Sequence, residues 1–524
     1  MSIKIILFFI IFSLTFSSFG QVEGINLNTE EATRSYTLFN AYDKVYLIDN
    51  CGDIVHEWQA SSLRHHAKLL PNGDIIYIEG GWIFRYNWEG ASVAQLTDND
   101  PEIHLEYEVI ILPNGNYLCV GRKNFSHAQF AEIGYWIPPG SFPTEIDVVV
   151  ELDQVTGNIV WEWDLADHVI QERDPNAPNY GVLKDNPQLL NTDAILTYDW
   201  ENTESFMING MDYNPDLDQI ILSVRKLSEL VIIDHSTTTA EAAGHSGGLY
   251  GKGGDILWRW GNPANYDCGT TANRSLFFEH NPKWITKGPH VGKISCYNNG
   301  LNRPNTPFGE QYSEVLVLAP QMDANWNYMR DANGAFLPAA PELNYGKMTT
   351  NTPFYSGYTS GAEFMANGNV YITNGYKGRL MEINSSGDVV WRYTVPNTYY
   401  IFRSEKYPLN YAAFSGRDLT PSGQLTGVMS DYECMIIDAL DEPELPKGEF
   451  KLSQVGHSEY IITNKQNKDF YYRLHDIRGV EVFRGKSIFA AQKINLNELV
   501  SGLYILSVVS EDGHQWLSFK LLKN

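Results

Sequence analysis

The segment LLPNGDIIYIEG, residues 69–80, places a Pro-Asn-Gly turn directly before an apolar run of the kind that forms a buried strand. Close copies recur as ILPNGNYLCVGR at residues 111–122 and as FMANGNVYITNG at residues 364–375. Weaker copies with the same order of polar turn and apolar strand begin at Asn214, Gly288 and Asp418. The chain therefore repeats one turn-and-strand unit about six times.

A second repeated unit lies between these copies and ends close to an aromatic residue. VYLIDNCGDIVHEW ends at Trp58, VVELDQVTGNIVWEW at Trp163, GGDILWRWG at Gly261 and LMEINSSGDVVWRY at Tyr393. Each is typical of a hairpin closed by a glycine turn, and the aromatic side chains are expected to pack between sheets. Two hairpins per repeat make a four-stranded sheet, and about six such sheets fit a propeller. We predict an all-β chain whose main domain, residues 21–445, is a six-bladed β-propeller.

The composition agrees with a sheet protein and excludes some partners. The 43 glycines and the 13% aromatic content suit turn-rich sheets. The formal net charge is −25 without any Lys/Arg run, so no nucleic acid partner is expected. The five cysteines include no Cys-x-x-Cys pair, which argues against a zinc site and a dense disulfide framework but allows one bridge. GKGGD at residues 251–255 lacks a phosphate-loop signature, and we expect neither a metal nor a bound cofactor.

The N-terminal residues predict export. Residues 1–20 combine Lys4, an apolar run from Ile5 to Phe16 and small residues up to Gly20, which is the layout of a secretory signal peptide. No later apolar run reaches the roughly 18 residues that a bilayer requires, so no transmembrane segment is expected. The sequence therefore predicts a secreted or surface protein that is exported through the periplasm.

The C-terminal segment, residues 446–524, lacks the blade motif and forms a separate module. Its phrases LHDIRGVEVFRG, SGLYILSV and the closing FKLLKN resemble the type IX secretion sorting domain of secreted Bacteroidetes proteins. The resemblance implies a small β-sandwich that the type IX secretion machinery recognises during export across the outer membrane. The alternative is an ordinary carbohydrate-binding β-sandwich.

Several polar side chains stand just ahead of the repeated units, where the inner strands of a propeller converge on its channel. His280 follows two phenylalanines in SLFFEHNPKWI and could act as nucleophile or general base, or be a histidine bonded between blades. Of the neighbours His65 and His66, only one can face the channel, because adjacent strand residues point to opposite faces. The other residues ahead of these units are His104, Glu106, Met207, Asn209, Tyr358, Ser360, Arg417 and Asp418.

Three arginines near these strands are candidates for binding a tetrahedral anion. Arg122 and Arg225 follow strand copies in VGRK and SVRK, and Arg303 follows the Asn-Asn-Gly turn after His280. A guanidinium is always charged and can bind sulfate or phosphate through two parallel hydrogen bonds. The alternative for each is an exposed arginine at a strand end.

Longer phrases resemble the bacterial arylsulfotransferases. They are GKGGDILWRWGNPANY (251–266), SLFFEHNPKWI (275–285), CYNNGLNRP (296–304), IDHSTTTAEAAGHSGG (233–248) and FYSGYTSGAEFMANGNVYITNG (354–375), and the likeness runs over most of residues 35–430. The resemblance implies a six-bladed propeller that transfers a sulfuryl group from a phenolic sulfate donor to a phenol acceptor. It implies no nucleotide donor, and a channel histidine that is transiently sulfated with other histidines and an arginine assisting.

Carried over by position, the resemblance implies His280 as a catalytic histidine and Arg303 as the arginine that follows it. With them we take Arg225 and Tyr358 as candidate catalytic residues. The candidate substrate-binding residues are His66, His104, Arg122, Met207 and Asn209.

Two positions depart from the family pattern. Met207-Ile208-Asn209 stands where the family has His-x-Asn, and Tyr358 stands where a histidine precedes the Ser-Gly-Ala phrase. Because a sulfated tyrosine is too stable to turn over quickly, His280 must then be the nucleophile. The alternative is a secreted propeller that binds an aryl or anionic ligand without catalysis. A quinone-dependent dehydrogenase is disfavoured, because no Asp/Glu pair clusters near the axis to hold calcium.

Overall fold

The computed structural model describes two compact units of this chain. The first unit is described over residues 23–60, 65–137, 143–194, 205–307, 310–346, 354–396 and 400–425. The second is described over residues 450–456, 458–464, 468–476, 481–487, 491–497, 499–510 and 516–523. The signal peptide expected at residues 1–20 and the domain boundary expected between residues 445 and 446 lie outside these ranges.

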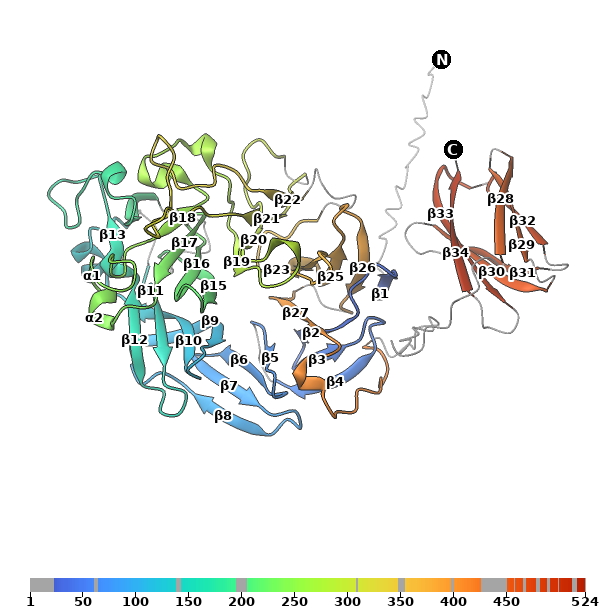
Figure 1. The fold of residues 1–524 in the computed structure, drawn as a ribbon, viewed down its shortest axis with the longest axis horizontal. Helices are drawn as coiled ribbons and strands as arrows, with labels where there is room; N and C mark the ends of the chain where they lie inside the picture. The colour runs from blue at the N-terminus through green and yellow to red at the C-terminus, as the bar shows by residue number, and fades with distance from the viewer. Residues whose placement is uncertain are drawn as a thin grey trace, which may run out of the picture. The chain divides into compact units, whose positions relative to one another are not determined.

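Within its described residues, the first unit contains six antiparallel sheets of four or five strands (Figure 1). The first three, in spatial order, are β27 (Ser404–Pro408), β2 (Ser35–Ala41), β3 (Lys44–Ile48), β4 (Ile54–Gln59); β5 (Lys68–Leu69), β6 (Ile75–Glu79), β7 (Trp82–Tyr86), β8 (Ser92–Leu96); and β9 (Ile103–Ile111), β10 (Tyr117–Asn124), β11 (Glu145–Leu152), β12 (Ile159–Asp164). The last three are β15 (Ile208–Asn214), β16 (Gln219–Val224), β17 (Glu229–Asp234), β18 (Trp258–Trp260); β19 (His280–Trp284), β20 (Ile294–Asn298), β21 (Glu314–Leu318), β22 (Leu343–Tyr345); and β23 (Gly361–Phe364), β24 (Val370–Asn374), β25 (Arg379–Ile383), β26 (Val389–Thr394), β1 (Gly24–Asn28).

The Asn-Gly turns join the first strand of a sheet to its second strand. Gly73 and Gly115 both have φ of 92°, which an L side chain rarely adopts, so glycine is required at these turns. The strand after each of these turns is the second of its sheet, because β6, β10 and β24 follow β5, β9 and β23 in the strand order. Antiparallel pairing brings the start of each first strand beside the end of the second, as His104 of β9 lies opposite Arg122 of β10.

The sixth copy of the repeat, expected at residues 418–428, lies partly outside the described residues, which end at residue 425 in this unit. Its described part, residues 418–425, forms no strand and makes only an isolated bridge between Asp53 and Gln424. The remaining sheet is instead completed by β27, which pairs with β2 from Ser35 opposite Pro408 to Phe39 opposite Ser404. Because β27 has no Asn-Gly turn beside it, the repeat pattern could not identify it.

The repeated tryptophans join neighbouring sheets, as the sequence predicted. Trp58, Trp163, Trp258 and Trp391 lie on β4, β12, β18 and β26, the fourth strand of each sheet, and are less than 2% exposed. Each indole N–H donates a hydrogen bond to a backbone carbonyl outside its own sheet. The acceptors are the carbonyls of Asn87, Gly254, Leu337 and Asn50, at 2.8–3.0 Å. Burial of the ring and a satisfied N–H together stabilise the sheet-to-sheet contacts.

The first strands of successive sheets lie next to one another, except that the short second sheet contacts its neighbour β9 through its second strand, β6. Contacts join β6 to β9, β9 to β15, β15 to β19, β19 to β23 and β23 to β27. The Tyr407 hydroxyl of β27 accepts a hydrogen bond from the Leu69 backbone of β5 at 2.9 Å. Figure 1 shows these first strands near the middle of the unit. The all-β class is confirmed, whereas each sheet is open and the six-bladed propeller stays a prediction.

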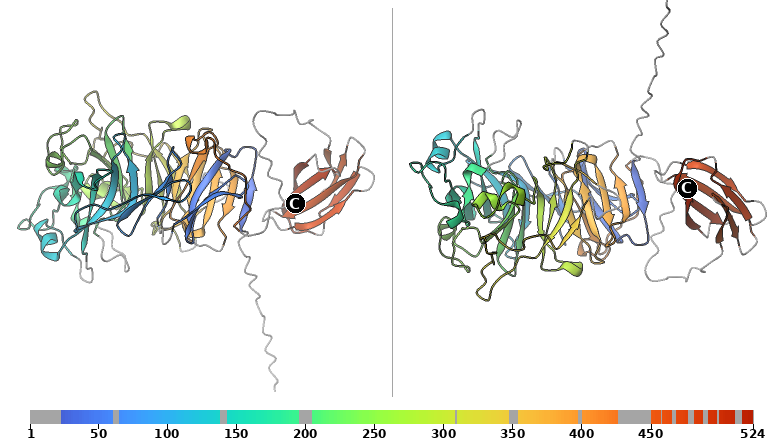
Figure 2. Two further views of the ribbon diagram at one scale, coloured as in Figure 1. Left: turned by 90° about the horizontal axis from the view of Figure 1, so that it is seen from below. Right: turned by 90° about the horizontal axis from the view of Figure 1, so that it is seen from above.

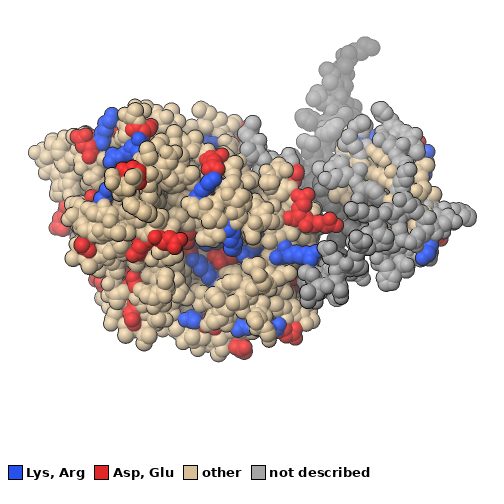
Figure 3. Space-filling view, in the orientation of Figure 1, with Lys and Arg blue, Asp and Glu red and all other residues tan. Residues whose placement is uncertain are grey.

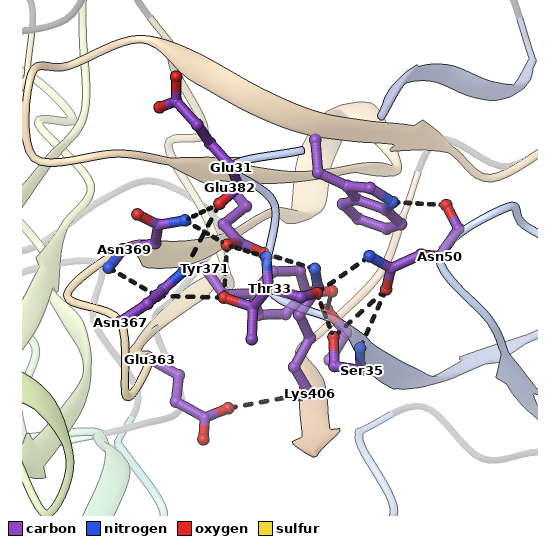
Figure 4. A network of polar contacts seen from close by, with 12 residues as sticks. Glu31, Thr33, Ser35, Asn50, Glu363, Asn367, Asn369, Tyr371, Glu382 and Lys406 are labelled. Atoms are coloured by element: carbon purple, nitrogen blue, oxygen red, sulfur yellow. Dashed lines mark hydrogen bonds and ion pairs between the residues drawn. The ribbon is translucent and has the colours of Figure 1, made fainter. Parts of the chain in front are cut away.

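A polar network ties residues 31–35, which follow β1, to the sixth sheet (Figure 4). The Glu382 carboxylate accepts from the Lys406 ammonium at 2.6 Å, from the Asn369 amide at 2.6 Å and from the Thr33 backbone at 2.7 Å. The Lys406 ammonium also lies 4.2 Å from the ring centroid of Trp391. Burial alone would raise the pKa of Glu382, but Lys406 lowers it, so the carboxylate is charged at neutral pH.

His235 bridges two carboxylates on neighbouring sheets. Its Nδ1 lies 2.8 Å from Asp218 and its Nε2 3.0 Å from Glu151 of β11. Burial alone would lower the pKa of His235, but the two carboxylates raise it above its ordinary value. Burial would likewise raise the pKa of Glu151, and its hydrogen bonds instead lower it to about 2.

We therefore expect His235→Gln to destabilise the protein more at about pH 6 than at about pH 9. A raised histidine pKa contributes stability that is fully present below the unfolded pKa of about 6.5 and is lost as the pH rises through the folded value. Urea unfolding at the two pH values measures the difference, with the exposed His127→Gln as control. An equal loss at both would show that His235 is not a bridging cation.

The second unit consists of two antiparallel sheets over one apolar core. Their strands are β28 (Phe450–Gly456), β29 (Glu459–Asn464) and β32 (Ala491–Asn495), and β31 (Glu481–Lys486), β30 (Phe470–Asp476), β33 (Gly502–Ser510) and β34 (Trp516–Lys523). Ile462 and Ile494 of one sheet pack with Phe470, Leu474 and Leu506 of the other, and Figure 2 shows this unit from two sides.

Little helix or parallel pairing interrupts the described sheets. The elements are α1 (His127–Glu132), α2 (Thr239–Ala242), short 3₁₀ turns, and the parallel pair β13 (Val169–Ile170) and β14 (Leu190–Asn191). Within the described ranges no helix has the length and apolar character needed to cross a bilayer.

Cys51 is disulfide-bonded, while Cys119, Cys268 and Cys296 are buried free thiols. On the face in Figure 3, Lys and Arg are scattered among acidic side chains.

Candidate active site

His280 begins β19, the first strand of its sheet, and its side chain is buried. Its Nδ1 lies 2.7 Å from Oδ1 of Asn299. The Asn299 amide nitrogen donates to the carbonyls of Ser356 at 2.7 Å and Thr359 at 2.9 Å. Because carbonyls only accept, the amide orientation is determined and Oδ1 must accept from His280. Nδ1 therefore carries the proton in the neutral ring, and Nε2 keeps its lone pair.

The surroundings of His280 keep the imidazole neutral. Burial lowers its pKa, and the guanidinium groups of Arg225 and Arg403 lower it further, to about 3. A neutral imidazole with an available Nε2 lone pair is the nucleophilic form of histidine. Two nearby guanidinium groups are also suitable donors for the oxygens of a sulfuryl group.

Arg225 brings the two unusual positions of the sequence together. It follows β16, and its guanidinium lies 4.9 Å from the Phe278 ring centroid and 5.7 Å from that of Tyr358. Its Nη1 also lies 3.5 Å from Sδ of Met207, which has a φ of 63°. Met207 and Tyr358 are thus neighbours of Arg225, the same cation that lowers the pKa of His280.

The first strands β9, β15 and β19 each contain a bulge close to the candidate site residues. The pairing of β9 with β10 skips Tyr107 and Glu108, that of β15 with β16 skips Asn209, and that of β19 with β20 skips Asn281 with its neighbour. Bulges re-aim side chains and are frequent beside active sites. Asn209 uses its bulge to donate to the Glu279 carbonyl at 2.9 Å and to accept from Ser223 at 2.5 Å. It therefore positions the residue before His280, and its buried amide is already occupied.

Phe402 and Arg403, directly before β27, connect the histidines. The Phe402 ring stacks on His66 at 5.8 Å and 11°, and meets His65 and His280 edge-on at 5.1 Å and 6.5 Å. Arg403 pairs with Glu108, which also binds Lys68 and lies 3.4 Å from Nε2 of His66.

In the group formed by Glu108, Arg403, Lys68 and His66, the carboxylate is charged and the imidazole is neutral. Burial alone would raise the pKa of Glu108, but Arg403, Lys68 and His66 hold it well below its usual range. Burial is the first cause that lowers the pKa of His66, to about 4, so the ring is neutral at neutral pH. The carboxylate therefore holds two cations beside neutral imidazoles.

His104 and Arg122 lie in a cavity of about 250 Å³ that also includes His65. Its lining is His65, Glu79, Gly80, His104, Leu105, Glu106, Tyr107 and Arg122. Arg122 lies 2.8 Å from Glu106 and 3.3 Å from Glu145, while His104 is half exposed. Of the two adjacent histidines, His65 lines this cavity and His66 packs against Phe402 and Glu108.

Arg303 is held away from this group. Its Nη2 lies 2.6 Å from Glu314, and its guanidinium lies between the rings of Phe277 at 4.7 Å and Tyr312 at 4.4 Å. Among the contacts recorded for the described residues, none joins Arg303 to His280. The structure places Arg403, rather than Arg303, beside the imidazole.

Sequence reasoning missed four residues of the site, namely Glu108, Asn299, Phe402 and Arg403. Asn299 carried a signal, since it lies in the Asn-Asn-Gly turn beside the candidate histidine. Arg403 lies directly before β27, the first strand of its sheet, and His280 is the first residue of β19, also a first strand. Because β27 was not recognisable from the sequence, the equivalent position of Arg403 was not either. Glu108 and Phe402 carried no local signal.

A family model described as Arylsulfotransferase (ASST) matches residues 22–393 of this chain. The chain belongs to the arylsulfotransferase family. The search of curated proteins found no match.

Solved structures show weaker likenesses to this arylsulfotransferase family member. Apo AztD from Citrobacter koseri is 9% identical with a TM-score of 0.29, covering 88% of this chain and 98% of that chain. Kuenenia stuttgartiensis hydrazine synthase is 10% identical with a TM-score of 0.30, covering 70% and 80%. A protein with an immunoglobulin-like β-sandwich fold from Bacteroides vulgatus is 16% identical with a TM-score of 0.14, covering 14% and 85%. At these TM-scores none establishes a shared fold.

Membership of the arylsulfotransferase family implies aryl sulfate donors and phenol acceptors. A sulfuryl group spreads negative charge over its oxygens, as a phosphoryl group does, so cationic donors and positioning are the requirements for transfer. In this family member, Arg225 and Arg403 lie near the neutral His280 and are cationic groups of the kind that such a transfer requires. Met207 and Tyr358 are the departures that any activity must accommodate.

Proposed function

We propose that this protein transfers a sulfuryl group from a phenolic sulfate ester to a phenol through a sulfated His280. The observation that carries the proposal is the tautomer of His280, which Asn299 determines through its hydrogen bonds. The Nε2 lone pair attacks sulfur, the bond from sulfur to the aryl oxygen breaks, and the phenolate leaves with the electron pair. In the second half-reaction the acceptor phenol gives its proton to the released phenolate or to water, its oxygen attacks sulfur, and the N–S bond returns its electrons to Nε2.

The remaining residues have subsidiary roles in this mechanism. Arg225 and Arg403 hold the sulfuryl oxygens, and Met207 and Tyr358 line the site beside Arg225. The cavity with His65, His104 and Arg122 receives part of the substrate. Tyr358 is given no nucleophilic role, because a sulfated tyrosine would turn over too slowly, whereas an N-sulfated histidine is labile. No bound cofactor is needed, because the donor already carries the activated group.

We infer that the six sheets are blades of one propeller. The support is the order of contacts, which leads from β5 and β6 through β9, β15, β19 and β23 to β27 and back to β5. In such an arrangement the first strands surround one axis, and residues at one end of these strands meet there. This accounts for side chains from several sheets meeting around Phe402.

The test of the function is transfer from 4-nitrophenyl sulfate to phenol without a nucleotide sulfate donor. We expect 4-nitrophenolate release that depends on the acceptor, because phenol discharges the sulfated enzyme. With donor alone, intact mass should show one added sulfuryl group that acid removes, located on His280 by peptide mapping. Donor binding without release or adduct would contradict the mechanism.

A second candidate function is binding of an aryl or anionic ligand without catalysis. Met207 and Tyr358 favour it, because both stand at positions where the family pattern has histidine. The same experiment decides between the two candidates. A saturable calorimetric signal with 4-nitrophenyl sulfate, together with no adduct and no turnover, would support the binding protein.

We also propose that the chain is exported and that the C-terminal unit is its sorting module, recognised by the type IX secretion machinery. The support is the layout of residues 1–20 and the phrases of the second unit, which has its own core. A chain ending at residue 445 should retain transfer when purified but fail to reach the surface of a type IX-competent host. Normal delivery of the shortened chain would refute the sorting role.

A further inference from the structure

Three potential metal ligands meet at the outer strands of the third and fourth sheets. His168 ends a 3₁₀ turn, Leu165–His168, directly after β12, His245 follows α2, and Asp255 lies just before β18. Each offers one ligand atom, and the three atoms lie within 4.8 Å of one another. His168 is separated from Asp255 by 87 residues, so no spacing motif marks the group in the sequence. No metal site is expected from the sequence.

The hydrogen bonding of His168 leaves one nitrogen facing a carboxylate. Its Nε2 lies 2.7 Å from the Ala242 carbonyl, which can only accept, so Nε2 must carry a proton. In the neutral ring Nδ1 then holds a lone pair, and it lies 3.1 Å from Oδ1 of Asp255. His245 places its Nδ1 2.7 Å from the same oxygen. An imidazole lone pair and a carboxylate oxygen repel each other unless a proton or a cation lies between them.

Neighbouring residues hold the His168 ring in this orientation without a bound ion. The His168 ring is fully buried and stacks on Trp163 at 5.4 Å with an interplanar angle of 1°. Trp163 donates to the Gly254 carbonyl at 2.8 Å. A Cβ on Gly254 would lie 1.9 Å from the Ala242 oxygen and 2.5 Å from Nε2 of His168, so glycine is required there. Histidine ligands usually donate their second N–H to a carbonyl, as His168 does.

We propose that His168, His245 and Asp255 form a zinc site that joins the third sheet to the fourth. Two imidazoles and one carboxylate are ligands that suit Zn²⁺, and three protein ligands leave a fourth position for water. The His245 side chain is 63% exposed, so this position faces solvent. The ion would replace the repulsion at Nδ1 by coordination and would link β12 to the segment before β18.

The test uses the purified full-length chain after dialysis against EDTA. Calorimetric titration with ZnCl₂ should give one ion per chain and a higher thermal midpoint, because only the folded chain assembles the ligands. Loss of an outer hydrogen-bond partner costs a zinc site about 10–100-fold in affinity, so removing a ligand in His245→Ala should cost at least about 100-fold. Asp255→Asn should behave similarly, and Co²⁺ should give a visible spectrum that both variants lose.

The exposed His127→Ala is the matched control and should bind zinc as the unchanged chain does. Because His245 is largely exposed, its alanine variant should fold, and circular dichroism checks this. Absence of zinc binding by the unchanged chain would overturn the proposal and leave a protonated His168 paired with Asp255. Equal zinc affinity in the unchanged chain and in His245→Ala would overturn it as well. Both readouts are independent of sulfuryl transfer.

Discussion

Replacing His280 by alanine is expected to lower kcat for sulfuryl transfer by roughly 10³-fold or more, the scale on which removal of a nucleophile acts. The variant lacks Nε2, the only protein atom that bonds to sulfur in the proposed mechanism. Arg225 and Arg403 remain, so the donor should still bind and the affinity for 4-nitrophenyl sulfate should change far less than kcat. Initial rates of 4-nitrophenolate release, together with calorimetric donor binding, measure the two effects separately.

His127→Ala is the control for this experiment, because His127 is exposed on α1, a different element from those that carry the site residues. The intact-mass adduct should disappear in His280→Ala together with turnover. Transfer at an unchanged rate in this variant would remove His280 from the mechanism. If transfer instead disappeared in Tyr358→Phe while His280→Ala retained it, Tyr358 would be the group that accepts sulfur.

Glu382→Gln is expected to lower the free energy of unfolding by about 3–5 kcal/mol, the usual effect of breaking a buried ion pair. Both side chains of the Glu382–Lys406 pair are fully buried, and the same carboxylate binds Asn369 and the Thr33 backbone. Glutamine preserves the volume but removes the carboxylate that binds the Lys406 ammonium directly. Tryptophan fluorescence during urea unfolding should report the loss, since Trp391 packs on Lys406.

Glu57→Gln provides the comparison, because the Lys44–Glu57 pair is solvent-exposed and such pairs contribute about 0–1 kcal/mol. The two substitutions are chemically identical and differ in burial and in the number of donors lost. A loss below about 1 kcal/mol in Glu382→Gln would show that the network in Figure 4 does not hold the N-terminal segment to the sixth sheet.

The sequence by itself determined the all-β class, the hairpins and the family. Asn-Gly turns depend on backbone preferences within a few residues, so residues 69–80 and 111–122 could be recognised as turn and strand without knowledge of the rest of the chain. The same holds for the hairpins that end at Trp58 and Trp163, whose burial between sheets follows from their large apolar rings. His280 could be selected because it lies in a long phrase that resembles the arylsulfotransferases.

Only the tertiary structure decided which side chains meet His280 and which strands complete the sheets. Arg403 pairs with Glu108 across 295 residues of sequence, and Thr33 binds Glu382 across 349. No local pattern reports such a distance, because the partners meet only when separate sheets are placed side by side. The pKa of His280 likewise depends on burial and on cations from other sheets, and this is why Arg403 stands beside the imidazole where sequence order favoured Arg303.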